Sequence, residues 1–211
     1  MPKNKLPVTG SRELRAFSLP DLQVSPEGNV VQGHAAVFGQ AYDMYGLWTE
    51  TIARGAFEKT DLSDVLFSVN HDLSKIPLAR SRNNNVNSTL QLAVDNQGLS
   101  TRAMLDVENN SEAKSLYSAV GRGDISGMSY IFVVRNDEWT GLDTDAPKRT
   151  ITDIAKVYEV SAVSMPANPG TDITARDASA LESAKKTLDS ARAKTLDSGE
   201  RRQRLILATY F

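Results

Sequence analysis

Short apolar segments bounded by turn-forming residues recur along most of the chain, and this pattern predicts a fold built mainly from β-strands. The residues Asp95-Asn96-Gln97-Gly98 separate two of these segments and favour a hairpin turn. The number of short strands is typical of a barrel or a sandwich. The segments that we expect to form strands are residues 16–19, 30–38, 65–71, 89–94, 99–105, 128–135 and 151–163.

One helix is indicated between residues 110 and 121. Its apolar positions are spaced i, i+3, i+4 and i+7, with a polar residue before the segment and a glycine after it. These positions are Ala113, Leu116, Tyr117 and Val120. We expect this face of the helix to pack on the sheet.

The chain divides into an arm, a main domain and a tail. Residues 1–13 are polar and without periodicity, which indicates a flexible arm. The main domain is expected over residues 14–176, and the composition then changes to Ala, Ser, Lys, Asp and Leu. The tail, residues 177–211, is expected to be partly helical and removable. A weak helical stripe runs through it, formed by Leu181, Ala184, Leu188 and Ala191.

The charge balance argues against a nucleic-acid or membrane partner. Lys and Arg total 24 and Asp and Glu total 26, giving a net charge of −2, so no overall positive field attracts polyanions. No apolar run approaches the roughly 18 residues needed to span a bilayer. The first residues are positively charged but have no apolar stretch behind them, so we expect a soluble chain that is not exported.

The chain contains no cysteine and two histidines. Without cysteine there are no disulfides, no thiol nucleophile and no thiolate metal ligands. Two widely separated histidines argue against a zinc site, and neither phosphate-binding glycine pattern is present. We therefore expect no metal and no cofactor, and any catalysis would use an oxygen nucleophile.

Ser129 is the one polar residue in a segment that is otherwise apolar on both faces from Met128 onward. Burying a hydroxyl without a partner costs about 1–3 kcal/mol, so a base or a backbone carbonyl is expected beside it. A serine bonded only to the main chain is the ordinary interpretation. Ser126 is the competing nucleophile, but its offset of three residues places it on the opposite face of a regular strand.

The two histidines differ in their surroundings. In an extended segment, His71 has the same parity as Val65 and Phe67 and would lie on the apolar side. The histidine reference pKa near 6.5 suits a base that takes a serine proton, although a bonded core or loop histidine is the common case. His34 lies among small residues and is expected to be packed or at a rim, with a third catalytic position as its reserve role.

Glu159 is a carboxylate in a hydrophobic strand, where an unpaired charge is costly. It would orient the ring of His71 if the two residues meet. A salt bridge to Arg80 or Arg102, or exposure at a strand edge, explains it equally well. The alternative acids are Asp72 and Asp153.

Several blocks, taken in order, resemble the maturation proteases of tailed-phage proheads. The resemblance covers about residues 15–175, and the ordered set is more specific than any single block. The blocks are Gly33-His-Ala-Ala-Val-Phe38, residues 50–57, Asn70-His71-Asp72, Pro77-Leu-Ala-Arg80, residues 123–132, and Glu159-Val-Ser-Ala-Val163 ahead of Pro166-Ala-Asn-Pro169.

The resemblance implies a fold similar to herpesvirus assemblin, a closed β-barrel with flanking helices (α+β). It places the nucleophile at Ser129 and the base at His71. Assemblin uses a second histidine as the third catalytic residue, whereas no histidine follows His71 here. Glu159 is our substitute for it. Arg80 or the turn at residues 121–127 is the expected source of the oxyanion site.

The implied function is a serine endopeptidase that cleaves scaffolding segments and the major capsid protein inside the assembling prohead, in the host cytoplasm. Its own tail is a further expected substrate, and association of the chain with itself is left open. The alternative is a catalytically silent capsid-assembly scaffold protein that retains the protease fold. A carbohydrate- or peptide-binding β-domain is a weaker third interpretation, because the aromatic residues, 7% of the chain, are scattered.

Overall fold

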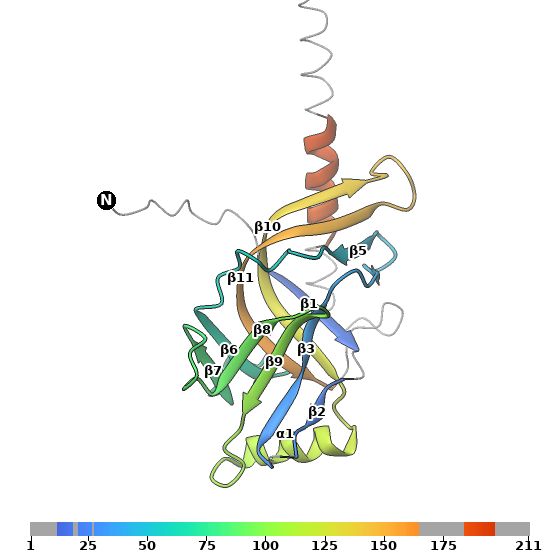
Figure 1. Cartoon of the computed structure of the whole chain (residues 1–211). Helices are drawn as coiled ribbons and strands as arrows, with labels where there is room; N and C mark the ends of the chain where they lie inside the picture. Colours follow the sequence, from blue (N-terminus) through green and yellow to red (C-terminus); the bar gives the residue numbers. More distant parts are fainter. Residues whose placement is uncertain (1–11, 19–20, 27, 165–183, 197–211) are drawn as a thin grey trace, which may run out of the picture. The chain divides into compact units, whose positions relative to one another are not determined.

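The computed structural model describes residues 12–18, 21–26, 28–164 and 184–196 (Figure 1). Residues 184–196 are helical in it, outside the labelled elements. The labelled elements are β1 (Glu13–Ser18), β2 (Gln23–Val24), β3 (Val30–Val37), β4 (Tyr42–Asp43), β5 (Thr49–Ile52), β6 (Asp64–Val69), β7 (Ala79–Arg82), β8 (Leu90–Val94), β9 (Gly98–Met104), α1 (Ser111–Arg122), β10 (Gly127–Thr140) and β11 (Lys148–Val163).

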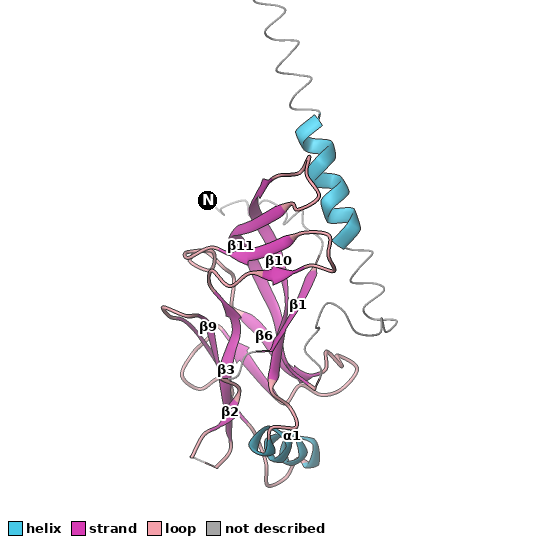
Figure 2. Cartoon of the chain, turned by 90° about the vertical axis from the view of Figure 1, so that its right-hand side faces the viewer, coloured by secondary structure: helices cyan, strands magenta, loops and turns pink. Residues whose placement is uncertain are grey.

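The strands pair into two sheets. The seven-stranded sheet has the order β1-β10-β11-β5-β4, and β6 pairs with both β11 and β7. The four-stranded sheet has the order β2-β3-β9-β8, and Figure 2 shows β2, β3 and β9 as a layer beside β1, β6 and β10. This confirms the expected class, mainly β with helices. The pairing of the described strands does not show a closed barrel.

The chain forms two compact units. The first contains residues 1–40, 51–137 and 151–168, and the second contains residues 41–50, 138–150 and 169–211. The core of the second unit consists of Met44, Trp48, Ala184 and Leu188. The helical stripe predicted in the tail thus supplies two of these core residues. Leu181, and residues 1–11 of the expected arm, lie outside the described residues.

Helix α1 confirms the predicted helix. The side chain of Asn110 caps its N-terminus by accepting hydrogen bonds from the backbone N–H groups of Glu112 and Ala113. Gly123 ends it in the left-handed conformation, with φ of 80°. The helix packs across β2 and β3 (Figure 1). Its buried residues are Ala113, Leu116 and Val120.

The strand predictions differ from the structure mainly at the ends. The predicted hairpin turn is confirmed, because the N–H of Asp95 donates to the carbonyl of Gly98 at 3.0 Å. The strand predicted over residues 65–71 ends at Val69, since Asn70 and His71 have φ angles of 51° and 58°. The short strands β2, β4, β5 and β7 were not predicted. Each has two to four residues, too few for a clear alternation.

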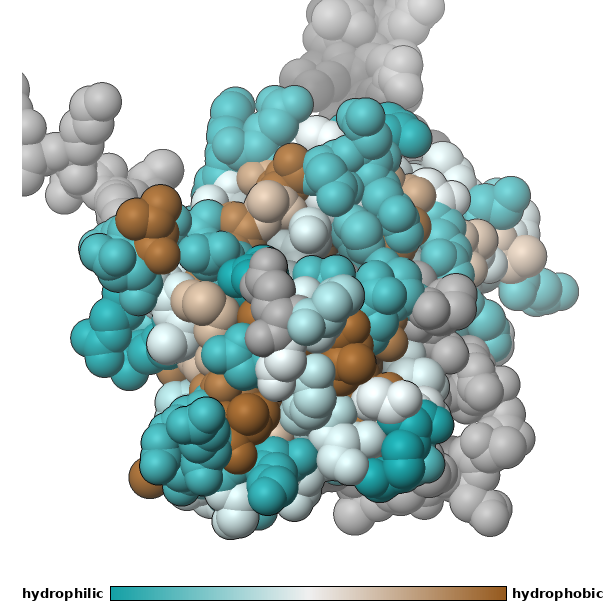
Figure 3. Space-filling view, turned by 60° about the horizontal axis from the view of Figure 1, so that its bottom comes forward, coloured by the Kyte–Doolittle hydropathy of each residue, from teal (hydrophilic) through white to brown (hydrophobic). Residues whose placement is uncertain are grey.

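The described surface is mostly hydrophilic on the face shown in Figure 3. Hydrophobic residues form small separate patches between hydrophilic ones on this face. In the part of the chain that the structure describes, no helix is long and apolar enough to cross a membrane.

Gly98 occupies the tightest backbone contact in the four-stranded sheet. It pairs with Val37 next to a bulge, where the register of β3 against β9 shifts between His34 and Ala36. A Cβ atom at Gly98 would lie 1.9 Å from the carbonyl oxygen of Ala36. Only glycine therefore fits here without moving a backbone.

We expect Gly98→Ala to lower the free energy of unfolding by about 1–3 kcal/mol, because the bulge must shift to admit the methyl group. Gly121→Ala is the matched control, since its Cβ would meet no atom closer than 3.7 Å. This helical position should be neutral or gain up to about 1 kcal/mol from the better propensity of alanine. Urea unfolding of both variants measures this. Equal effects at the two glycines would contradict the close contact at Gly98.

Candidate active site

Ser129, His71 and Glu159 meet in one hydrogen-bonded chain in the first unit. Oγ of Ser129 lies 2.5 Å from Nε2 of His71, and Nδ1 of His71 lies 2.6 Å from Oε2 of Glu159. The three residues come from β10, from the turn after β6, and from β11. Residues separated by 58 and 88 positions in the sequence are thus in direct contact.

The alternation of β10 explains the direction of Ser129. The rings of Tyr130 and Phe132 stack with their centroids 4.4 Å apart. The ring centroid of Tyr130 also lies 6.5 Å from that of Phe57 in the core. Because successive side chains of a strand point to opposite faces, Ser129 lies on the other face of β10. The strand is buried on both faces there, as the sequence predicted.

Glu159 is fixed on its face by the parallel pairing of β11 with β6. In this pairing Glu159 lies opposite Leu66, and Ser161 lies opposite Ser68. Glu159, Ser161 and Ser68 therefore share one face of the sheet. The Ser68 hydroxyl donates to Oε1 of Glu159, while His71 contacts Oε2. Glu159 is buried, so the alternatives of exposure and of a bridge to Arg80 or Arg102 do not describe it.

The parity argument for His71 was wrong, because His71 is not in an extended segment. In a continued strand it would lie on the face of Phe67, away from Glu159. Instead Asn70 and His71 both adopt the left-handed conformation, which asparagine and histidine tolerate better than most residues. This turn brings the ring of His71 back to the Glu159 face. Two residues held in this less favourable backbone conformation are a reason to ask whether the turn serves a function.

The turn that carries His71 is fastened to β11 and the residue after it. The N–H of Asn70 donates to the carbonyl of Ala162 at 2.9 Å, and its side-chain oxygen accepts from the N–H of Ser164 at 3.0 Å. The N–H of His71 donates to Oγ of Ser161 at 3.0 Å. Main-chain and side-chain contacts together set the position of the imidazole.

Ser129 has two acceptors for a single proton. Its Oγ lies 2.7 Å from the carbonyl oxygen of Arg15 on β1, in addition to its contact with Nε2 of His71. A hydroxyl donates one hydrogen bond at a time. With the ring proton on Nδ1, facing Glu159, the Ser129 proton goes to Nε2. With a doubly protonated ring, Nε2–H donates to Oγ, and the hydroxyl proton turns to Arg15.

The site is closed to solvent at the serine. Ser129 and Glu159 have no exposed surface, and the His71 side chain is 13% exposed. Edge strand β1 lies beside β10 in the sheet, with Ala16 paired to Ser129, and its Arg15 carbonyl contacts Oγ of the serine. Oγ of Ser129 is therefore not accessible to solvent in this arrangement.

The other candidates from the sequence lie outside this hydrogen-bonded chain. Ser126 is exposed, just before β10 begins. The remaining polar candidates have other partners: Asp72 accepts from Ser74, Asp153 pairs with Arg135, and Arg80 forms a two-pronged pair with Asp64.

His34 forms a separate polar cluster. Its Nδ1 lies 2.5 Å from Asp21, and its Nε2 lies 2.9 Å from Asp95. Burial acts to lower the pKa of His34, but the hydrogen bonds to the two carboxylates outweigh it and raise the pKa above its ordinary value. His34 therefore has carboxylate partners of its own and does not contact the Ser129 chain. The described residues contain no group of three or more acidic or histidine side chains suited to a metal ion.

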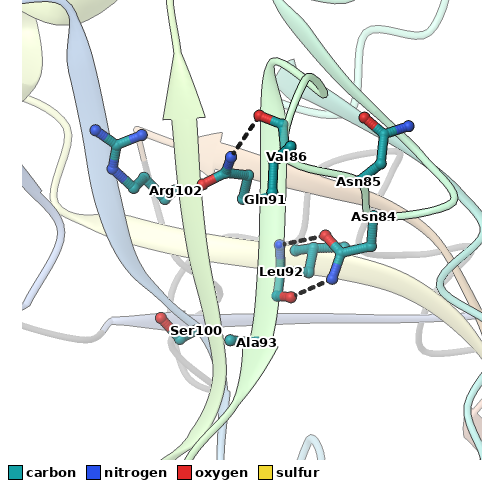
Figure 4. Close-up of a pocket in the computed structure, with 8 residues that line it drawn as sticks. All are labelled: Asn84, Asn85, Val86, Gln91, Leu92, Ala93, Ser100 and Arg102. Atoms are coloured by element: carbon teal, nitrogen blue, oxygen red, sulfur yellow. Dashed lines mark hydrogen bonds between the residues drawn. The ribbon is translucent and has the colours of Figure 1, made fainter.

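A hollow lies at the edge of the four-stranded sheet, and Ser129, His71 and Glu159 do not line it (Figure 4). Its volume is about 370 Å³. Asn84 bonds both the N–H and the carbonyl of Leu92, at 2.9 and 2.5 Å, so its amide replaces a neighbouring peptide group. The lining residues are Asn84, Asn85, Val86, Gln91, Leu92, Ala93, Ser100 and Arg102.

Comparison with known proteins identifies the family of the chain. The family described as Caudovirus prohead serine protease matches residues 18–187. The chain belongs to this family. The prohead protease of Enterobacteria phage HK97 is 27% identical over 165 residues, which cover 76% of this chain and 66% of that protein, slightly less than two thirds of its length. No solved structure matches significantly.

The family confirms the resemblance seen in the sequence, and its matched range includes Ser129, His71 and Glu159. Two serines that lie beside these three residues, Ser68 and Ser161, were not predicted from the sequence. A signal was present for Ser161: it lies two residues after Glu159, so both share one face of a strand. Nothing in the sequence paired Ser68 with Glu159, because that contact depends on the parallel register of β6 and β11.

The His34 cluster gives the stability of the chain a pH dependence. A histidine whose folded pKa is raised stabilises the fold fully below its unfolded pKa, and this contribution is lost as pH rises through the folded pKa. We expect wild type to lose stability relative to His34→Gln as pH rises above about 6.5, the ordinary pKa of histidine. Urea unfolding across this range measures the difference. A constant difference between the two proteins would contradict the cluster.

Proposed function

We propose that this chain is a serine endopeptidase of phage prohead maturation, with Ser129 as nucleophile, His71 as general base and Glu159 as the acid that orients His71. The observation that carries the proposal is the continuous chain of contacts from Glu159 through His71 to Ser129, at 2.6 and 2.5 Å, in a member of the prohead serine protease family. Serine, histidine and a carboxylate in this order form the arrangement that activates a serine hydroxyl.

The reaction proceeds in two balanced halves. Nε2 of His71 takes the Ser129 proton as Oγ bonds to the peptide carbonyl carbon, and the imidazolium then protonates the departing amine as the C–N bond breaks. Water repeats the sequence on the acyl-enzyme, releasing the acid and restoring the serine. Glu159 holds the Nδ1 proton throughout and stabilises the transient imidazolium. The oxyanion requires hydrogen-bond donors beside the reacting carbonyl. The N–H groups of Gly123, Asp124 and Ile125 in the expected turn already donate to carbonyls at the end of α1, so we assign none of these three to that role.

The substrates in this proposal are scaffolding segments and extensions of the major capsid protein, cleaved inside the assembling prohead in the host cytoplasm. The support is the family and the name of the HK97 relative, a prohead protease. Residues 177–211 are proposed as a removable tail that the enzyme cleaves itself.

We also propose that the two sheets close into an assemblin-like barrel through β7 and β8. These strands belong to different sheets but lie side by side in the first unit. Side chains bridge them: Thr89 accepts from the N–H of Arg80 at 2.9 Å, and Asn84 bonds Leu92 as described above. Such contacts stand in for the missing ladder of backbone hydrogen bonds.

Processing of a capsid substrate tests the nucleophile. We expect Ser129→Ala to abolish cleavage of a co-expressed major capsid protein and scaffold, and to leave the mass of the chain itself unchanged over time, because among the described residues no other hydroxyl contacts His71 Nε2. Ser126→Ala, which changes the exposed neighbour, should retain both activities. Unaltered processing by folded Ser129→Ala would favour the catalytically silent scaffold protein.

The role of Glu159 is tested by Glu159→Gln, which keeps the size of the side chain but replaces the acceptor that fixes the Nδ1 proton. We expect acylation of Ser129 by a fluorophosphonate to slow by about four orders of magnitude, as expected when a triad histidine is left in the wrong tautomer. Stopped-flow or mass-resolved labelling gives the rate. A loss below about tenfold would remove Glu159 from the mechanism.

A further inference from the structure

We propose that Ser161, together with Ser68, is a positioning residue that sets the direction of the protons around His71. The inference rests on the proposed function, since it concerns how the same site is held ready. Neither serine touches the reacting atoms, and both would act through His71 and Glu159. Both are buried on the Glu159 face of the sheet.

The contacts form a closed ring that begins and ends at His71. The N–H of His71 donates to Oγ of Ser161 at 3.0 Å, and Oγ of Ser161 lies 3.1 Å from Oγ of Ser68. The Ser68 hydroxyl donates to Oε1 of Glu159. The other carboxylate oxygen, Oε2, faces Nδ1 of His71 at 2.6 Å. The backbone N–H and the imidazole of His71 thus contact the two ends of one hydrogen-bond network.

Counting protons fixes the direction of every bond in this ring. Ser68 gives its one proton to Glu159, so towards Ser161 it can only accept. Ser161 must therefore donate to Ser68, which leaves its oxygen to accept from the N–H of His71. Both oxygens of Glu159 receive protons from donors, which matches an ionised carboxylate. Nδ1 of His71 then donates to Oε2 of Glu159, and Nε2 can accept from Ser129 when the ring carries this single proton.

This arrangement matters for the reaction because His71 stands in a left-handed turn at the end of a strand. The bond from its N–H to Ser161 holds the turn in that conformation, and the bond from Ser68 prevents the carboxylate of Glu159 from rotating away. Removing a group that hydrogen-bonds to a catalytic side chain and orients it commonly lowers enzyme activity by one to two orders of magnitude. We expect Ser161→Ala to slow acylation of Ser129 by about tenfold or more.

The matched control is Ser81→Ala. Ser81 is also a fully buried serine in a strand of the first unit, and its hydroxyl has no hydrogen-bond partner among the described residues. Removing it changes the packing to the same extent as removing Oγ from Ser161, but it leaves the ring around His71 intact. A general effect of losing a buried hydroxyl would appear in both variants.

The first measurement, the protonation of the His71 ring, does not require the chain to have enzymatic activity. The chain has two histidines, so ¹⁵N-histidine NMR of the full chain, with His34→Gln used for assignment, observes His71 alone. We expect a protected Nδ1–H signal in wild type and in Ser81→Ala. In Ser161→Ala and in Ser68→Ala this signal should weaken or the ring should populate the other tautomer. Ser68→Ala provides a second test should Ser161→Ala fail to fold.

The second readout is the rate of fluorophosphonate labelling as a function of pH. We expect Ser161→Ala to lower the maximum labelling rate and to shift the pH at which half of that rate is reached. Ser81→Ala should give the same maximum rate and the same pH dependence as wild type. If both serine variants keep the wild-type tautomer, rate and profile, the positioning role is wrong and the proposed function stands. If wild type itself is not labelled and shows no protected Nδ1–H, the proposed function fails first.

Discussion

A buried carboxylate determines much of the arrangement around this site. Glu159 has no exposed surface, and a charge in such a position must be matched by donors. The donors come from β6 and from the turn that follows it: Ser68 contacts one oxygen, and His71 contacts the other. The parallel register of β6 and β11 brings these groups together. The imidazole is thus held between a fixed acid and the hydroxyl of Ser129.

The parts of the site that the sequence predicted were those in which a polar residue interrupts an apolar strand. Ser129 and Glu159 stood out because burying a hydroxyl or a charge requires a partner, and that argument needs no knowledge of the fold. His71 was selected on chemistry and on family resemblance, while the strand-parity argument for it failed. Two consecutive left-handed residues reversed its direction, and single-sequence periodicity carries no signal for such a turn.

In the fold, too, the local elements were predicted from the sequence and the long-range pairings were not. Helix α1 and the hairpin at residues 95–98 follow from local cap and turn residues, and both were predicted. The partners of β6 and β11, and hence the contact of Ser68 with Glu159, depend on pairing over 91 residues, which local pattern does not encode. The helical stripe of the tail was predicted, but not that Ala184 and Leu188 pack with Met44 and Trp48 in a second unit.

The burial of Ser129 links the resting state to the chemistry. The Ser129 hydroxyl lies 2.7 Å from the Arg15 carbonyl oxygen and 2.5 Å from Nε2 of His71, so its single proton has two candidate acceptors. In the proposed reaction a peptide must reach this buried hydroxyl, so access to the serine is a separate step from its activation.

The most direct test of the central claim is the location of the adduct formed by a small organophosphate with the folded full chain. Peptide mapping by mass spectrometry after a limiting reaction identifies the modified residue. The account requires a single adduct on Ser129 that disappears when the chain is unfolded before treatment, since only the folded chain brings Nε2 of His71 within 2.5 Å of Oγ. An adduct on Ser126 or on scattered hydroxyls, or equal labelling of the unfolded chain, would contradict it.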